Sequence, residues 1–179
     1  MTDPAAAHLR AFFAAIGVDL ASDPELERTP ERFTELLRDR FVPSSPVPEL
    51  GVLPAPAARD VVVVRDLAFH ALCVHHIVPM FGTVDIAYLP GASITGFGAF
   101  ARLVSAIARR PQLQERLVRD IADAIETQLA PRALVVRATA RQMCVELTRC
   151  GAAPTTVVVA GRGLWAGDEA RGAARDLFA

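Results

Sequence analysis

The first third of the chain has the hydrophobic pattern of helices. Apolar residues recur at helical spacing from Leu9 to Ile16, and the pattern stops at Gly17. A second helix is expected to begin at Thr29-Pro30-Glu31-Arg32, with Thr29 as its N-cap and the proline in its first turn. Residues 42–58 carry five prolines and no periodicity, which predicts a loop or linker.

Beyond residue 60 the pattern changes to strands and two further helices. Apolar residues from Val61 to Leu72 predict a long strand that delivers Cys73 at its end. Pro111 separates the two helices, because it can begin the second but cannot continue the first. The other expected elements are helices at Phe97–Arg110 and Gln112–Leu129, and strands at Val84–Leu89, Leu134–Ala140, Cys144–Thr148 and Thr155–Ala160.

This order of elements predicts an α+β fold, an antiparallel sheet with helices packed on one face. At 179 residues the chain is expected to form a single domain. Residues 1–58 form an N-terminal helical extension with its proline-rich linker, and residues 59–179 form the main domain.

The amino-acid composition limits the partners and the chemistry that the protein can have. Hydrophobic residues make up 52% of the chain and the net charge is −1, so neither nucleic acid nor a membrane is expected as a partner. All 19 basic residues are arginine, which excludes a lysine Schiff base or a lysine phosphate clamp. No apolar run reaches the roughly 18 residues of a membrane span. Three cysteines without a signal peptide predict reduced thiols in the cytoplasm.

Those thiols and two histidines carry the candidate chemistry. Cys73-Val-His-His76, together with Cys144 on a separate segment, offers three ligands for one zinc ion and leaves a spare histidine beside it. Three protein ligands leave a coordination position open for water, as in catalytic zinc sites. The residues therefore predict a hydrolase, with Cys150 as a small buried hydrophobe and His70 in a structural role.

Several segments resemble a known family. Cys73-Val-His-His-Ile-Val-Pro-Met-Phe-Gly82 is followed by Ile86-Ala-Tyr-Leu-Pro90, and Cys144 follows Cys73 by 71 positions. Three further segments belong to the same pattern: Thr29-Pro-Glu-Arg32, Ala108-Arg-Arg-Pro-Gln-Leu-Gln-Glu-Arg-Leu117, and Thr155-Thr156 with Gly161 and Gly163. Together these motifs resemble GTP cyclohydrolase I from about Ile16 to Trp165.

The resemblance implies a fold, an assembly and a site. The fold would be the tunnelling fold, in which sheets of several subunits join into a barrel, and the protein would be a homo-oligomer, usually a decamer, with active sites at interfaces. Zn²⁺ would be the cofactor and a purine or pterin the small-molecule substrate. The metal ligands would be Cys73, His76 and Cys144, with His75 as the acid–base residue. The substrate-binding positions would be Gln114 and Glu115 against the purine, with Arg102, Gln142 and Arg149.

The implied reaction is hydrolysis of the guanine imidazole ring. His75 would handle the proton at N7 while C8 is attacked, and a second hydrolysis would release formate. Rearrangement of the ribose and ring closure would then give 7,8-dihydroneopterin triphosphate. A carboxylate at Glu115 suits the adjacent N–H donors of a 2-amino-4-oxo pyrimidine ring.

The chain departs from the family pattern at several positions. Val74 replaces a glutamate, Gly98-Ala99 a Ser-Lys pair, Gln142 a histidine and Thr148 an arginine, although Arg102 is retained and Arg149 stands beside Thr148. The serine, lysine and arginine of the family hold the triphosphate. We therefore expect a zinc cyclohydrolase for a related purine or pterin without a triphosphate. The alternatives are an ordinary GTP cyclohydrolase I and a non-catalytic zinc-containing partner subunit.

Overall fold

The computed structural model describes residues 3–42, 46–55, 59–148 and 154–179. It divides the chain into two compact units, Met1–Val42 and Pro43–Ala179. The division falls earlier than the boundary at residue 58 expected from the sequence. The difference arises because the proline-rich segment contributes to the second unit: Leu50 is buried in its core, and its backbone N–H donates to Oε1 of Gln128.

The N-terminal unit is a helical pair formed by α1 (Pro4–Ala15) and α2 (Thr29–Phe41), with a short 3₁₀ turn, η1 (Pro24–Leu26), between them. Asp3 caps α1 by accepting a hydrogen bond from the Ala5 N–H. The expected N-cap of α2 was one residue late. Arg28 is the cap, because its carbonyl already accepts from the Arg32 N–H, and Thr29 is the first helical residue.

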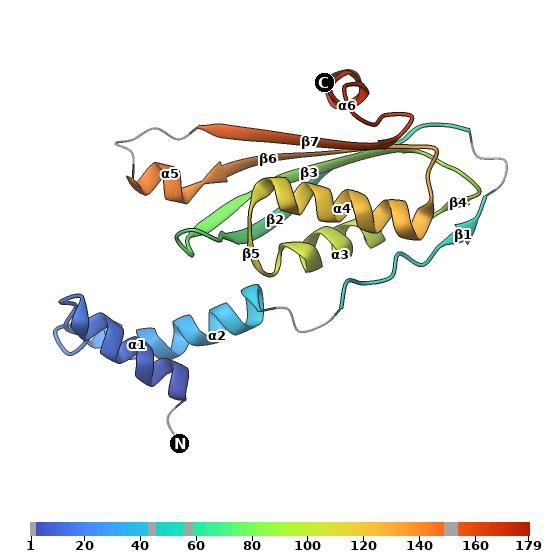
Figure 1. The fold of residues 1–179 in the computed structure, drawn as a ribbon. Helices are drawn as coiled ribbons and strands as arrows, with labels where there is room; N and C mark the ends of the chain where they lie inside the picture. Colours follow the sequence, from blue (N-terminus) through green and yellow to red (C-terminus); the bar gives the residue numbers. More distant parts are fainter. Residues whose placement is uncertain (1–2, 43–45, 56–58, 149–153) are drawn as a thin grey trace. The chain divides into compact units, whose positions relative to one another are not determined.

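The second unit is built on a five-stranded sheet of order β5-β2-β3-β6-β7 (Figure 1). Each pair of neighbours among β2, β3, β6 and β7 is antiparallel, whereas β5 runs parallel to the end of β2. Two very short strands, β1 and β4, pair separately. The bounds are β1 Leu53–Pro54, β2 Val62–Cys73, β3 Pro79–Leu89, β4 Ser93–Ile94, β5 Pro111–Gln112, β6 Ala133–Gln142 and β7 Thr155–Gly163.

Two helices, α3 (Phe97–Ala108) and α4 (Gln114–Leu129), cover one face of this sheet (Figure 1). Their apolar stripes, including Leu103, Leu117 and Ile121, enclose the main core with the side chains of alternate strand positions such as Ile86 and Val136. The expected α+β class is confirmed, and both helices that the sequence predicted for this part of the chain lie on one face of a mainly antiparallel sheet.

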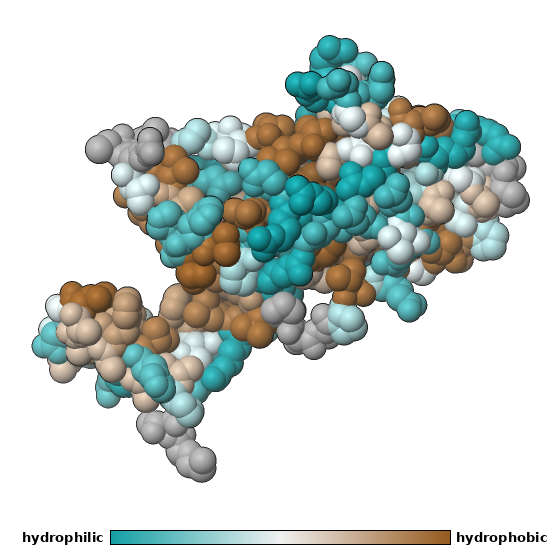
Figure 2. Space-filling model, in the orientation of Figure 1, coloured by the Kyte–Doolittle hydropathy of each residue, from teal (hydrophilic) through white to brown (hydrophobic). Residues whose placement is uncertain are grey.

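A third helix, α6 (Glu169–Leu177), was not expected from the sequence and packs on the opposite face of the sheet. Ala170 and Ala174 lie there against Ala87 and Val135, whose side chains point away from the main core. The outer surface of α6 is hydrophilic (Figure 2). The helix therefore covers part of the sheet face for which the sequence predicted no helix.

Two local expectations were wrong. The segment Cys144–Thr148 is part of a six-residue helix, α5 (Met143–Thr148), and not a strand. Its apolar–polar alternation is too short to separate a strand from a helical turn. Pro111 lies in β5 and does not begin α4, which starts at Gln114 after an extended Leu113.

None of the helices in the described part of the chain is long and apolar enough to cross a membrane.

Candidate metal centre and active site

The first half of the site is the tight turn that follows β2. The Ile77 N–H donates to the Cys73 carbonyl over 2.8 Å, which closes one helical turn, and the Cys73 N–H donates to the Val78 carbonyl over 2.8 Å. Ile77 has a φ of 54°, a left-handed conformation that is unfavourable for a β-branched residue. Strained backbone of this kind persists where surrounding contacts impose it, often at functional sites. The turn leaves Cys73 buried and His75 and His76 exposed.

The close approach of β3 to its neighbouring strand β6 supports this turn. A side chain at Gly82 would place its Cβ 2.0 Å from the carbonyl oxygen of Thr139 on β6. Only glycine therefore permits this approach of the two strands. Since β3 begins just after the turn and β6 ends just before α5, the approach fixes the two segments that carry the sulfur ligands.

The second half of the site is Cys144 on α5. One ligand atom each from Cys73, His76 and Cys144 lie within 4.8 Å of one another. In a tetrahedral zinc site with bonds of about 2.0–2.3 Å, ligand atoms are separated by roughly 3.5–3.8 Å. Two thiols and one imidazole at this spacing form a donor set suited to zinc, so the residues fit the expected cofactor. They are the same three residues that the family resemblance nominates.

Proximity of the two sulfurs has an electrostatic consequence. Burial, and then the neighbouring thiol of Cys73, raise the pKa of the Cys144 thiol above its ordinary value. Two thiolates side by side in a partly buried site repel each other, and a divalent cation removes that repulsion. The cluster is therefore better suited to a metal than to two free thiolates.

We predict that zinc affinity rises steeply with pH. A thiol with a raised pKa is protonated near neutral pH, so metal binding must release its proton. The apparent affinity should increase about tenfold per pH unit for each proton released, up to the pKa of the thiol. Competition titrations with a chromophoric chelator at pH 6, 7 and 8 measure this slope. A flat profile would mean that no thiol proton is displaced.

His75 lies beside the cluster. Its Nδ1 is 3.9 Å from Sγ of Cys73, and its ring centroid is 6.4 Å from that of His76, with the rings nearly perpendicular. One imidazole thus belongs to the ligand group while the other stands next to it and is exposed to solvent. This is the arrangement needed for a proton carrier adjacent to a metal.

Gln114 is the centre of a buried hydrogen-bond network. Its side-chain amide donates to the carbonyls of Ala138 (2.9 Å) and Thr156 (3.1 Å). Its Oε1 accepts from the Thr156 hydroxyl (2.6 Å) and from Nε2 of Gln142 (2.9 Å). With only 3% of Gln114 exposed, this network joins the start of α4 to β6 and β7. Two of the expected substrate-binding residues, Gln114 and Gln142, are therefore bonded to each other.

Replacing Gln114 with alanine should destabilise the protein by about 1–3 kcal/mol, because buried partners on β6 and β7 lose their hydrogen bonds. Urea denaturation should show a lower midpoint with an unchanged m-value. Thr127→Ala, at an exposed position of the same helix, is the control and should change the stability by no more than about 0.5 kcal/mol. Equal stability of the two variants would show that the network contributes little.

The remaining predicted substrate residues are more dispersed. Glu115 follows Gln114 in the first turn of α4 and is exposed. Arg102 is exposed on α3, and a Cβ added at Gly98 would lie 3.6 Å from its Nη1. Arg149 and Cys150 lie outside the described residues. The roles of all five predicted substrate-binding residues stay predictions.

Thr156, Arg141 and Glu146 are site residues that the sequence did not single out for a role. Thr156 belongs to a family-like segment, but its bonds to Gln114 and Gln142 depend on the register of β6 and β7. Arg141 and Glu146 form an ion pair across the β6–α5 junction. His70, exposed on β2, stacks on Phe81 at 6.3 Å between ring centroids, in keeping with a structural role.

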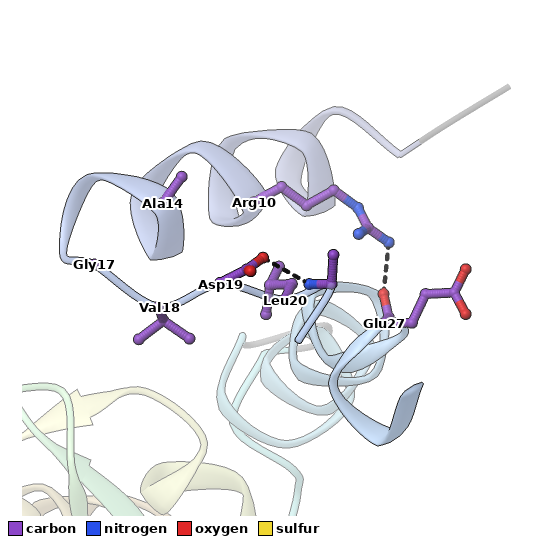
Figure 3. Close-up of a pocket in the computed structure, with 8 residues that line it drawn as sticks. Arg10, Ala14, Gly17, Val18, Asp19, Leu20 and Glu27 are labelled. Carbon is purple, nitrogen blue, oxygen red and sulfur yellow. Dashed lines mark hydrogen bonds between the residues drawn. The ribbon is translucent and has the colours of Figure 1, made fainter. Parts of the chain in front are cut away.

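A separate cavity of about 550 Å³ lies in the N-terminal unit, between α1 and the segment that follows it (Figure 3). Arg10 reaches across it and donates to the carbonyl of Glu27 over 2.8 Å. The same guanidinium also pairs with Glu31. The residues that line the cavity include neither a cysteine nor a histidine, and Nη2 of its arginine is already bonded to Glu27 and Glu31, so we place the chemistry at the cysteine–histidine cluster.

Known proteins with related sequences decide the family. The model of the GTP cyclohydrolase I family matches residues 5–175. The chain belongs to the GTP cyclohydrolase I family. The GTP cyclohydrolase 1 of Halalkalibacterium halodurans is 38% identical over 162 residues, with 87% of this chain and 85% of that protein covered. The Bacillus subtilis enzyme of the same name is 35% identical, with 90% and 87% covered, and that of Leifsonia xyli is 37% identical, with 88% and 85% covered.

As a GTP cyclohydrolase I family member the chain is an enzyme, a hydrolase acting on cyclic amidine C–N bonds. The family's tunnelling fold agrees with the antiparallel sheet and its paired helices. Solved structures with a partial likeness include Escherichia coli dihydroneopterin aldolase in complex with neopterin (TM-score 0.46, 15% identity, 58% of this chain and 99% of that chain). Another is the archaeosine synthase QueF-Like in its apo form (TM-score 0.45, 16% identity, 55% and 91%).

Proposed function

We propose that the protein is a zinc-dependent GTP cyclohydrolase I that converts GTP and water to 7,8-dihydroneopterin triphosphate and formate. The observation that carries this proposal is the cluster of Cys73, His76 and Cys144 with His75 beside it, in a chain whose curated relatives are named GTP cyclohydrolase 1. Those relatives favour the ordinary enzyme over the divergent, non-triphosphate substrate that the sequence departures suggested. They also favour an enzyme over a non-catalytic partner subunit.

Each residue of the site has a distinct proposed task. Cys73, His76 and Cys144 hold the metal, which when bound supplies Lewis acidity and lowers the pKa of coordinated water toward neutrality. His75 carries a proton to and from N7 of the guanine ring. Glu115, exposed at the start of α4, accepts the two N–H donors of the pyrimidine ring as a charge-assisted pair.

Gln142 affects how proton transfer is divided among the residues of the site. An amide does not titrate, so Gln142 cannot move the proton that the family's histidine at this position would handle. In this structure Gln142 instead donates to Gln114 and helps fix the start of α4. More of the proton transfer therefore falls on His75.

A second candidate substrate is a guanine compound with fewer phosphates. Gly98 has no side chain, Thr148 is neutral, and the Thr148 hydroxyl donates to the Cys144 carbonyl over 2.5 Å. Ala99 is 4% exposed, so this position offers the substrate neither a charge nor an open surface. Within α3 (Phe97–Ala108), Arg102 is the only cationic residue that could bind a phosphate.

Formate release from GTP, GMP and guanosine distinguishes the two candidates. We expect kcat/KM for GTP to exceed that for guanosine by a hundredfold or more, which corresponds to about 2.7 kcal/mol of transition-state stabilisation. Arg102→Ala should reduce this preference without affecting guanosine. Equal kcat/KM values for the three compounds would establish the second candidate. No formate from any of them, with zinc bound, would refute both.

We further propose a homo-oligomer that works in the reducing cytoplasm. The two described cysteines are free thiols, and thiolate ligands persist best in a reducing compartment. No described strand pairs with the outer edge of β7, and Val157 on that strand is 56% exposed. An open strand edge with apolar side chains is a surface suited to pairing with another copy. Sedimentation or light scattering would test the assembly.

A further inference from the structure

The two partners of an ion pair flank Cys144 in the sequence. Arg141, next to the end of β6, donates from Nε to Oε1 of Glu146 over 2.9 Å and from Nη2 to Oε2 over 2.7 Å. These two parallel hydrogen bonds are the bidentate geometry in which an arginine–carboxylate pair is strongest and most directional. Cys144 lies between the two partners, on the first turn of α5. The Arg141–Glu146 pair is called the clamp below.

The helix that carries Cys144 has no fully buried side chain to anchor it. α5 contains six residues, none of them buried, and Leu147 is 68% exposed. Helices this short are not stable by themselves, because nucleation costs more than a single turn of hydrogen bonds returns. Intrinsic stability and a fully buried side chain are therefore both missing from α5, and its half-buried residues 143–146 leave its orientation open to a further contact.

The clamp connects this weak helix to the rigid sheet. Arg141 pairs in register with Phe81 on β3, and its guanidinium carbon lies 5.9 Å from the centroid of the Phe81 ring. The side chain of Glu146 is 16% exposed and that of Arg141 is 50% exposed, so the carboxylate is the more sheltered partner. The sheet thus holds the arginine, the arginine holds the glutamate, and the glutamate orients the turn that bears the sulfur.

We propose that the clamp is a positioning device for the metal centre: Arg141 and Glu146 orient α5 so that Sγ of Cys144 reaches the metal held by Cys73 and His76. The inference rests on the proposed zinc site. Neither Arg141 nor Glu146 is a ligand or a catalytic residue in it. Their contribution is to bring the third ligand to within 4.8 Å of the other two before the metal arrives.

Zinc affinity of the variants tests the clamp. Groups that orient metal ligands typically change metal affinity by about 10–100-fold when they are replaced. We expect Arg141→Ala and Glu146→Gln each to weaken zinc binding about tenfold in chelator competition. The exchange variant Arg141→Glu/Glu146→Arg should recover most of that loss, because the pair is restored with its charges reversed. The cobalt-substituted protein adds a second measurement, since its visible absorption reports the ligand geometry.

A matched control is the pair formed by Arg162 on β7 and Asp123 on α4, which is also made by two guanidinium nitrogens of one arginine. Arg162 pairs with Leu134 near the start of β6, whereas Cys144 follows the other end of that strand. Asp123→Ala should leave zinc affinity and the cobalt spectrum unchanged. A general loss of stability would instead affect control and clamp variants alike.

The outcomes separate the clamp from the proposed function. If the natural protein binds no zinc, the proposed function fails. If it binds zinc and both single variants bind it equally well with the same cobalt spectrum, the clamp is refuted while the metal site stands. Affinity that falls in the single variants and is not recovered in the exchange variant would also overturn the clamp, because each residue would then act separately. Glu146→Gln, which keeps the shape of the side chain, secures the test if Arg141→Ala does not fold.

Discussion

Cys144→Ser protein should be purified with essentially no zinc and should release no formate. Serine replaces a soft thiolate with a hydroxyl that is a poor ligand for zinc, and only Cys73 and His76 then remain of the three-ligand group. The natural protein should carry about one zinc per chain. Metal analysis by inductively coupled plasma mass spectrometry, with protein concentration from amino-acid analysis, gives this ratio directly.

Cys150→Ser is the matched control, since it removes the one cysteine for which no role in metal binding is proposed. We expect it to retain its metal and its turnover. Equal loss of zinc in both variants would show that the choice of the second sulfur is wrong. Because Cys144 lies on a helix without buried residues, the Cys144 variant should remain folded. Near-native circular dichroism would confirm that metal loss is not a result of unfolding.

His75→Ala should keep its zinc and lose turnover by about 10²–10⁴-fold, the usual range for a positioned acid–base residue. The loss should fall at the high end of this range because Gln142 offers no second titrating group. Single-turnover formate release together with zinc content, measured on the same sample, checks both halves of the prediction.

The alternative outcome has a definite structural meaning. His75 Nδ1 lies only 3.9 Å from Sγ of Cys73, so a small rotation of the turn would let His75 take the place of His76 on the metal. If His75→Ala loses zinc while His76→Ala retains it, the two histidines exchange the roles proposed above. His76→Ala is therefore the necessary companion variant.

Periodicity predicted the elements that bury a long apolar stripe. Helix α4 places Leu117, Ile121 and Ile125 on one face, a spacing that is unambiguous over four turns. Strand β2 was visible for the same reason, although its bulge between Val64 and Leu67 was not. Elements that are stabilised by burial show this apolar periodicity in the sequence, and the sequence therefore predicted them.

Short elements leave no such record. Over the six residues of α5, alternation and helical spacing are nearly indistinguishable, and the deciding interactions are side-chain bonds such as Arg141 to Glu146. Helix α6 escaped notice because its buried face consists largely of Ala170 and Ala174, which give a weak apolar signal. In both cases the structure depends on contacts that periodicity does not reveal.

The metal ligands illustrate the same limit. Residue types and spacing indicated a zinc site, but on the residues alone either His75 or His76 could have been the ligand, and the family resemblance made the choice. The network around Gln114 was beyond sequence reasoning, because Gln142 and Thr156 approach it only through the register of β6 with β7. A buried glutamine at the start of an exposed helix turn has no distinctive pattern.

The short parallel strand β5 has a mechanical consequence. Leu72 and Cys73 pair with Pro111 and Gln112, and the Val74 N–H donates to the Gln112 carbonyl over 3.1 Å. The turn that carries Cys73 is therefore tied by hydrogen bonds to the segment that leads into α4, which restricts movement of Glu115 relative to Cys73. We therefore expect any opening of the site for product release at α5, which has no buried side chain and which the Arg141–Glu146 clamp ties to the sheet. We expect amide hydrogen exchange to be fast along α5 and slow across β5.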